Sequence, residues 1–215
     1  LIGGILGGII SSTATTVSYA RRSKTMPTEA GATSIVLVIM VASTIAFARF
    51  IALVLAFAPH QASRLLPPLT AMAGVMALIT FALLPTLRRA QPPMAVEGNP
   101  SELKTALVFG GLYAVVIFLV AAANSHLGTR ALYLISVVSG TTDMDAITLS
   151  TARLMDKGQL TPDLGWRLIL IASLSNIAFK GFIAAFLGSR ALAWRVAMAF
   201  SAAIIGGVGI FFFWP

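Results

Sequence analysis

The chain has 215 residues, of which 58% are hydrophobic and 10% charged, and its mean hydropathy is +0.92. This composition excludes an ordinary soluble domain, because several apolar stretches reach the roughly 20 residues that a bilayer-spanning helix needs. The net charge of +8 does not indicate nucleic-acid binding, since the basic residues cluster between apolar stretches, as they do in membrane proteins. The chain has no cysteine, which excludes disulfides and cysteine-bound metals.

Hydropathy predicts an all-α, polytopic membrane helix bundle of about seven spans. In chain order, the predicted spans are 1–22, 31–57, 68–87, 103–124, 131–155, 163–188 and 191–213. We expect one integral membrane domain built from a first membrane repeat at 1–90, a cytoplasmic linker at 91–102 and a second membrane repeat at 103–215. The start in an apolar run without Met suggests excision from a longer protein.

Two copies of one polar motif support the division into repeats. Residues 8–21 align with residues 140–153 without a gap, both beginning with Gly and ending with Ala-Arg. The same offset aligns 43–52 with 175–184, where seven of ten residues are identical. Polar segments at matching places in a duplicated bundle are typical of the binding site of a transporter.

The distribution of basic residues gives a predicted orientation. Nine fall on one side of the seven-span topology: Arg21, Arg22, Lys24, Arg88, Arg89, Lys104, Arg153, Lys157 and Arg167. Four fall on the other: Arg64, Arg130, Arg190 and Arg195. The richer side is predicted to be cytoplasmic, together with the C-terminus, in the inner membrane. Both motif copies then run in the same direction, so the repeats are predicted to be parallel, with interrupted helices.

Two carboxylates lie within a predicted span, Asp143 and Asp145. A charge at the centre of a membrane helix costs roughly 2.5–3.5 kcal/mol, so such residues are paired, hydrated or functional. Ser139-Gly140 predicts an interruption, with Asp143 near the N-terminus of the following half-helix. The two carboxylates, with Thr142 and Thr148, are candidate ligands of an ion or proton. Alternatively, Asp143 caps a broken helix and Asp145 pairs with a base.

Further polar residues are predicted to lie at the same depth. Asn176 is a neutral candidate ligand, and Lys180, one turn later, is the expected charge partner of the Asp pair. Arg49 has a similar depth in the first repeat and is expected to reach the headgroups. The first motif copy either lines a polar path or packs helices together. Its candidate lining residues are Ser11, Ser12, Thr13, Thr16 and, farther along the chain, Thr44.

These motifs together carry a resemblance to a known family. The motifs are 11–21, 139–150 and 173–180, and the chain resembles the uncharacterised C-terminal membrane domain that follows an MgtC/SapB-type membrane domain in bacteria and archaea. The resemblance implies an upstream MgtC/SapB-type domain as a partner and, by association alone, a link to magnesium homeostasis.

Two functions are compatible with these residues. The first is a small-cation or proton-coupled transporter or channel-like module with a site at the midplane. The second is a regulatory or scaffold domain that does not transport. We expect no enzyme activity and no cofactor, leave the metal open, and expect lipid, a small ion and a possible second copy of the chain as partners.

Overall fold

The computed structural model describes residues 2–25, 29–85, 128–142 and 144–214. Within these residues every regular element is a helix: α1 (Ile2–Ile10), α2 (Ser12–Arg22), α3 (Glu29–Phe57), the short 3₁₀ helix η1 (Pro59–Gln61), α4 (Ala62–Leu83), α6 (Gly128–Thr142), α7 (Met144–Asp156), α8 (Pro162–Leu187) and α9 (Arg190–Phe213). The all-α prediction is therefore confirmed in this part of the chain. The predicted span 103–124, the linker 91–102 and Asp143 lie outside the described residues.

Among the described residues, four helical segments are long and apolar enough to cross a bilayer. They are Gly31–Phe57, Pro59–Leu83, Pro162–Leu187 and Arg190–Phe213. The predicted spans 1–22 and 131–155 are each divided into two shorter helices of 9 to 15 residues. At 1.5 Å per residue the described parts of these helices are about 14–23 Å long, less than a hydrocarbon core of about 30 Å. The prediction of about seven spans is therefore not confirmed in the described residues.

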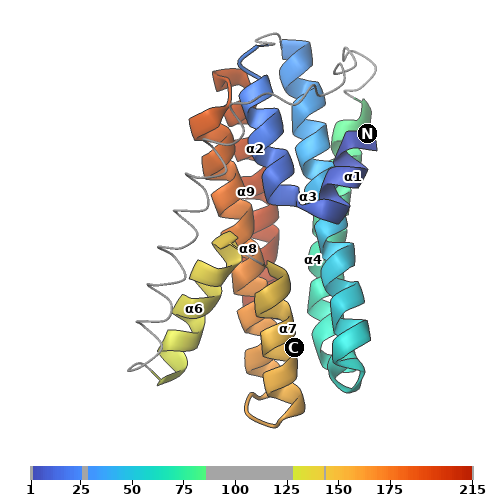
Figure 1. Cartoon of the computed structure of the whole chain (residues 1–215), viewed down its shortest axis with the longest axis vertical. Coiled ribbons are helices and arrows are strands. Elements are labelled where there is room, and N and C mark those ends of the chain that lie inside the picture. Colours follow the sequence, from blue (N-terminus) through green and yellow to red (C-terminus); the bar gives the residue numbers. More distant parts are fainter. Residues whose placement is uncertain (1, 26–28, 86–127, 143, 215) are drawn as a thin grey trace.

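The first divided segment is a helical hairpin. Gly3 of α1 packs against the hydroxyl end of Tyr19, and Gly7 packs against Thr15, both on α2. These pairs lie symmetrically about Ser11, so α2 folds back along α1 and does not continue it. Figure 1 shows α1 descending to mid-height and α2 rising from there to the top. The glycines have the packing role expected of small residues between membrane helices.

The second divided segment has the opposite direction. In Figure 1, α6 rises from the lower end to mid-height and α7 returns to the lower end. Its closest packing is on α8, where a Cβ on Gly140 would lie 2.8 Å from the Cα of Ala172. The predicted interruption is present, but α6 continues through Gly140 to Thr142 and α7 begins at Met144. α6 and α7 therefore separate after Thr142 and before Met144, later than the Ser139-Gly140 pair suggested.

The long helices α3 and α8 run in opposite directions. Arg195, near the start of α9, donates a hydrogen bond to Thr33, near the start of α3. Because α9 begins directly after α8 ends, the start of α3 lies at the end of α8 (Figure 1). The prediction of parallel repeats is therefore wrong, since parallel repeats would give α3 and α8 the same direction.

This geometry also removes the basis of the charge-derived orientation. Arg21 and Arg22 end α2 at the upper end in Figure 1, whereas Arg153 near the end of α7 lies toward the lower end. The seven-span topology placed all three on one side. A span that crosses the membrane ends on the opposite side, whereas a hairpin returns to the side from which it entered. Each hairpin that is taken for a span therefore reverses the predicted side of all later segments.

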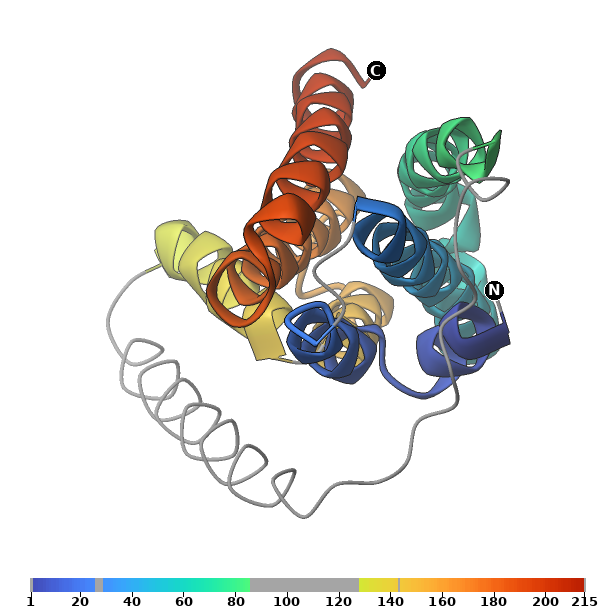
Figure 2. The same ribbon diagram turned by 90° about the horizontal axis from the view of Figure 1, so that it is seen from above.

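The two hairpins meet between the long helices. Both α2 and α7 contact α3 as well as α8. Figure 2 shows α2 and α7 near the centre, with the α3–α4 pair on one side and the α8–α9 pair on the other. Polar caps fix the ends of these elements: Thr161 accepts from the N–H of Leu164 at the start of α8. Ser23, after α2, accepts from the N–H of Ser189 before α9.

Candidate functional site

A pocket of about 230 Å³ lies where the two helix breaks meet. Its lining comes from both hairpins and from both long helices: Ile10, Ser11, Ser12, Thr13, Arg49, Phe50, Thr142, Met144, Asp145 and Asn176. Six of these are predicted site residues, namely Ser11, Ser12, Thr13, Thr142, Asp145 and Asn176. The fold therefore brings together residues that are more than 130 positions apart in the sequence.

The first break is produced by Ser11. Its backbone is extended (φ −164°, ψ 108°), and its hydroxyl oxygen accepts from the N–H of Ala14 at 3.2 Å, which caps α2. The N–H of Ser11 still donates to the carbonyl of Gly7 at 2.7 Å, so α1 keeps its last backbone hydrogen bond. A serine in this conformation ends one helix and starts the next without leaving its own polar groups unpaired.

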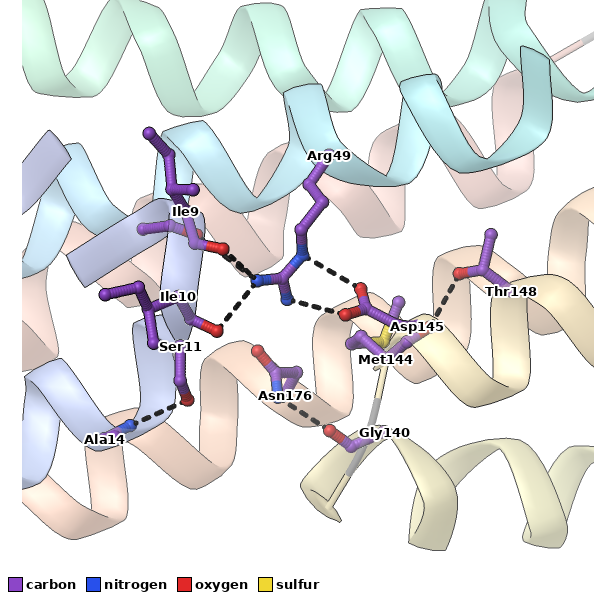
Figure 3. A network of polar contacts seen from close by, with 11 residues as sticks. Ile9, Ile10, Ser11, Ala14, Arg49, Gly140, Met144, Asp145, Thr148 and Asn176 are labelled. Atoms are coloured by element: carbon purple, nitrogen blue, oxygen red, sulfur yellow. Dashed lines mark hydrogen bonds and ion pairs between the residues drawn. The ribbon is translucent and has the colours of Figure 1, made fainter. Parts of the chain in front are cut away.

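An arginine joins the two breaks (Figure 3). Arg49 of α3 forms a two-point ion pair with Asp145 in the first turn of α7: Nε to Oδ1 and Nη2 to Oδ2 are both 3.1 Å. Its third nitrogen, Nη1, donates to the carbonyls of Ile9 at 3.0 Å, Ile10 at 3.2 Å and Gly8 at 3.4 Å. The guanidinium thus satisfies both a carboxylate and the C-terminal carbonyls of α1, which match its planar fork of donors.

The second break is held by an amide. Asn176 of α8 is 5% exposed, and its Nδ2 donates to the carbonyl of Gly140 at 2.7 Å. One residue earlier, the hydroxyl of Ser175 donates to the carbonyl of Val137 at 2.6 Å. These two contacts fasten the last turn of α6 to α8. In Figure 3 the amide oxygen of Asn176 is turned toward the side on which Ile10 and Arg49 lie.

Lys180 was predicted to pair with Asp143 or Asp145; Asp143 lies outside the described residues, so the structure bears only on the pairing with Asp145. It is 2% exposed, and in the described part of the chain its Nζ has one hydrogen bond, to Ser43 Oγ of α3 at 3.5 Å. The ion pair of Asp145 is formed by Arg49 instead, so the assignment of Lys180 as the partner of Asp145 is wrong. Arg49 does not extend to the headgroups, because α7 brings a carboxylate beside it in the interior.

Three predicted hydroxyl ligands lie outside the pocket lining. Thr148 and Thr16 are fully buried and donate to carbonyls one turn back in their own helices, those of Met144 at 2.7 Å and Ser12 at 2.9 Å. Thr44 does the same within α3 and also contacts the hydroxyl of Thr80 on α4 at 2.9 Å. Their hydroxyls are already satisfied, which supports packing rather than binding for these positions.

One feature of the sequence indicates that Arg49 has a partner inside the protein. Arg49 is the one charged residue of the predicted span 31–57. A lone charge within such an apolar stretch implies an internal partner. The identity of that partner depends on the crossing of α3 and α7, which no spacing in the sequence shows. The carboxylate of Asp143, also predicted at this site, lies outside the described residues.

The fold and this site define a multi-pass helical membrane protein with a polar pocket between two interrupted segments. The chain belongs to the family described as a domain of unknown function (DUF4010), whose model matches residues 1–188. The predicted resemblance to an uncharacterised membrane domain is therefore confirmed, and the association with an MgtC/SapB-type domain stays a prediction.

One curated relative is an uncharacterised protein of Aquifex aeolicus, 39% identical over 94 residues. The match covers 44% of this chain and 41% of that protein, so this chain spans less than half the length of its relative. No solved structure matches the chain.

Proposed function

We propose that the chain is a transport module for a small ion, in which two inverted repeats present interrupted helices to a shared site. The observation that carries the proposal is the pocket formed by both breaks and bridged by Arg49 and Asp145. Interrupted helices at the interface of inverted repeats are how many secondary transporters bind ions and substrates within the membrane.

Several contacts support the inverted relation. The break at Ser11 and the one between Thr142 and Met144 occupy equivalent places in the aligned motif copies. Under the exchange of α1 with α6, α2 with α7, α3 with α8 and α4 with α9, the packing of the bundle is preserved. Thus α1 packs on α3 as α6 packs on α8, and α2 contacts α8 as α7 contacts α3. The opposite directions of α3 and α8 support a relating axis that lies in the plane of the membrane.

The chemistry of the lining supports binding rather than catalysis. Arg49 and Asp145 compensate each other, and the remaining polar lining residues are hydroxyls and one amide. Such a set can replace water around a small ion, but it offers no arrangement of nucleophile and base. We therefore propose ion transport as the function. We also propose that the exposed apolar side chains contact the lipid bilayer.

A scaffold domain is the second candidate function. The observation in its favour is that Arg49 and Asp145 in the pocket pair with each other. Such an internal ion pair can serve to fix the arrangement of the helices. The MgtC/SapB-type partner implied by the resemblance would fit this role as well as transport. The two candidates differ in whether ions cross the bilayer.

The deciding experiment is ion flux in proteoliposomes. Wild-type protein is compared with Asn176→Leu, which removes the amide from the pocket, and with Arg64→Gln at an exposed position of α4. Flux should be present in the wild type, lost in Asn176→Leu and kept in Arg64→Gln. A folded wild-type protein that gives no flux of Na⁺, K⁺, H⁺ or Mg²⁺ above empty liposomes would favour the scaffold.

A further inference from the structure

The C-terminal ends of α1 and α6 have different partners in the two halves. A helix C-terminus carries partial negative charge and carbonyl groups without partners in the helix, so it attracts cations. At α1 the chain provides its own cation, because Arg49 donates to the carbonyls of Gly8, Ile9 and Ile10. At α6 the neutral amide of Asn176 bonds the carbonyl of Gly140.

The sequence explains this difference. In the aligned motif copies the residue equivalent to Arg49 is Gly181, which has no side chain. There is room at this position, because a Cβ on Gly181 would meet its nearest neighbour, a ring carbon of Phe200, at 3.6 Å. In the described residues no hydrogen bond reaches the carbonyl oxygens of Thr141 and Thr142 at the end of α6. The second half therefore has a helix C-terminus with carbonyl groups, that of α6, but no guanidinium group equivalent to that of Arg49.

Other oxygen atoms lie beside this end of α6. Asn176 is buried and lines the pocket, and within the described part of the chain no donor is found for its amide oxygen. Thr13, the counterpart of Asp145 in the alignment, also lines the pocket, as does Thr142. The second half thus offers amide, hydroxyl and carbonyl oxygens where the first half has a carboxylate and carbonyls around Arg49.

We propose that the C-terminal end of α6, with the amide oxygen of Asn176 and the hydroxyl of Thr13, binds a monovalent metal cation of the size of Na⁺ or K⁺. This cation takes, in the second half, the place that the guanidinium of Arg49 takes in the first. The inference deepens the proposed function and rests on its inverted repeat, since it names the ion that the module carries or uses for coupling.

The ligand set fits a monovalent cation better than the alternatives. Magnesium requires near-ideal octahedral geometry and is usually held through carboxylates and retained water. Here the carboxylate of Asp145 is engaged by Arg49, and the described residues contain no cluster of three His, Cys, Asp or Glu side chains. An anion fits less well, because Ser11 already caps the N-terminus of α2 and the first turn of α7 carries the carboxylate of Asp145.

The test measures cation binding directly, apart from transport. The thermal unfolding of the whole chain in lipid nanodiscs is followed while NaCl or KCl replaces choline chloride at constant ionic strength. We expect a saturable rise in the unfolding temperature with Na⁺ or K⁺. Gly181→Arg supplies the second half with the guanidinium of the first and should abolish this rise. Gly181→Ala adds a methyl group in ordinary contact distance of Phe200 and should retain it.

A second pair of variants changes the ligands themselves. Thr13→Asp gives the second half the carboxylate of the first and should lower the half-saturating cation concentration by about tenfold or more. Thr13→Val removes a ligand at nearly constant volume and should raise that concentration. This pair also tests the site if Gly181→Arg does not fold.

The inference is overturned if neither Na⁺ nor K⁺ stabilises the protein beyond choline, or if MgCl₂ alone does so. It is equally overturned if the Thr13 variants leave the cation dependence unchanged. Cation binding without flux in proteoliposomes would refute the proposed transport and leave this site standing. Flux without any dependence on Na⁺ or K⁺ would refute this site and leave transport standing.

Discussion

Removing Arg49 should destabilise the bundle more than removing its carboxylate partner. Loss of one partner costs about 3–5 kcal/mol for a fully buried ion pair and leaves an uncompensated charge. Exposed pairs contribute about 0–1 kcal/mol. The Arg49 and Asp145 side chains are 27% and 38% exposed, so solvent screens the pair in part. We therefore expect Asp145→Asn to lower the free energy of unfolding by about 1–2 kcal/mol.

Arg49→Met has a second consequence. It also leaves the carbonyls of Gly8, Ile9 and Ile10 without the donor that satisfies them, at about 1 kcal/mol for each well-formed hydrogen bond lost. The bonds of 3.0 and 3.2 Å are well formed, and the one of 3.4 Å is weak. Arg49→Met should therefore cost about 2 kcal/mol more than Asp145→Asn.

The measurement is the free energy of unfolding in mixed micelles with increasing SDS, for both single variants and the double variant. Arg64→Met serves as the control, because it removes an exposed arginine near the start of α4. The double-variant cycle isolates the coupling between the two side chains. Equal losses for Arg49→Met and Asp145→Asn would refute the argument, since they would show that Arg49 contributes nothing at the end of α1.

Three further predictions concern neighbouring positions. Lys180→Met should raise the free energy of unfolding by about 1 kcal/mol and reduce ion flux, because among the described residues its buried ammonium has one hydroxyl partner, and a charge buried in this way is costly; a loss of stability would contradict this. Gly140→Ala should cost about 1–3 kcal/mol in the same SDS titration, because its Cβ meets the backbone of Ala172, whereas Gly74→Ala in open space on α4 should cost nothing. Ser11→Ala should cost about 1 kcal/mol through the lost cap of α2 and Ser11→Asp should not, and equal unfolding midpoints for the two variants would exclude this role for Ser11.

Much of the candidate site was visible in the sequence, but its internal pairing was not. Asp145 and Asn176 were predicted as polar residues at midplane depth, and both line the pocket. Thr148 and Thr44 were also predicted there but do not line the pocket, and their hydroxyls donate to carbonyls one turn back in their own helices. Arg49 was misassigned because its partner is 96 residues away, and that contact exists only where α3 crosses α7.

By itself, the sequence determined that this is a helical protein with apolar segments of membrane-spanning length and with one polar motif present twice, 132 positions apart. Composition and length suffice for that, because a lipid environment permits little besides helices of sufficient hydrophobic length. Only the tertiary structure decided the direction of the second half. A polar break at Ser11 is equally compatible with a chain that continues across the membrane and with one that turns back. The choice is made by packing, here by Gly3 and Gly7 against α2, and it overturned the parallel repeat and removed the basis of the predicted orientation.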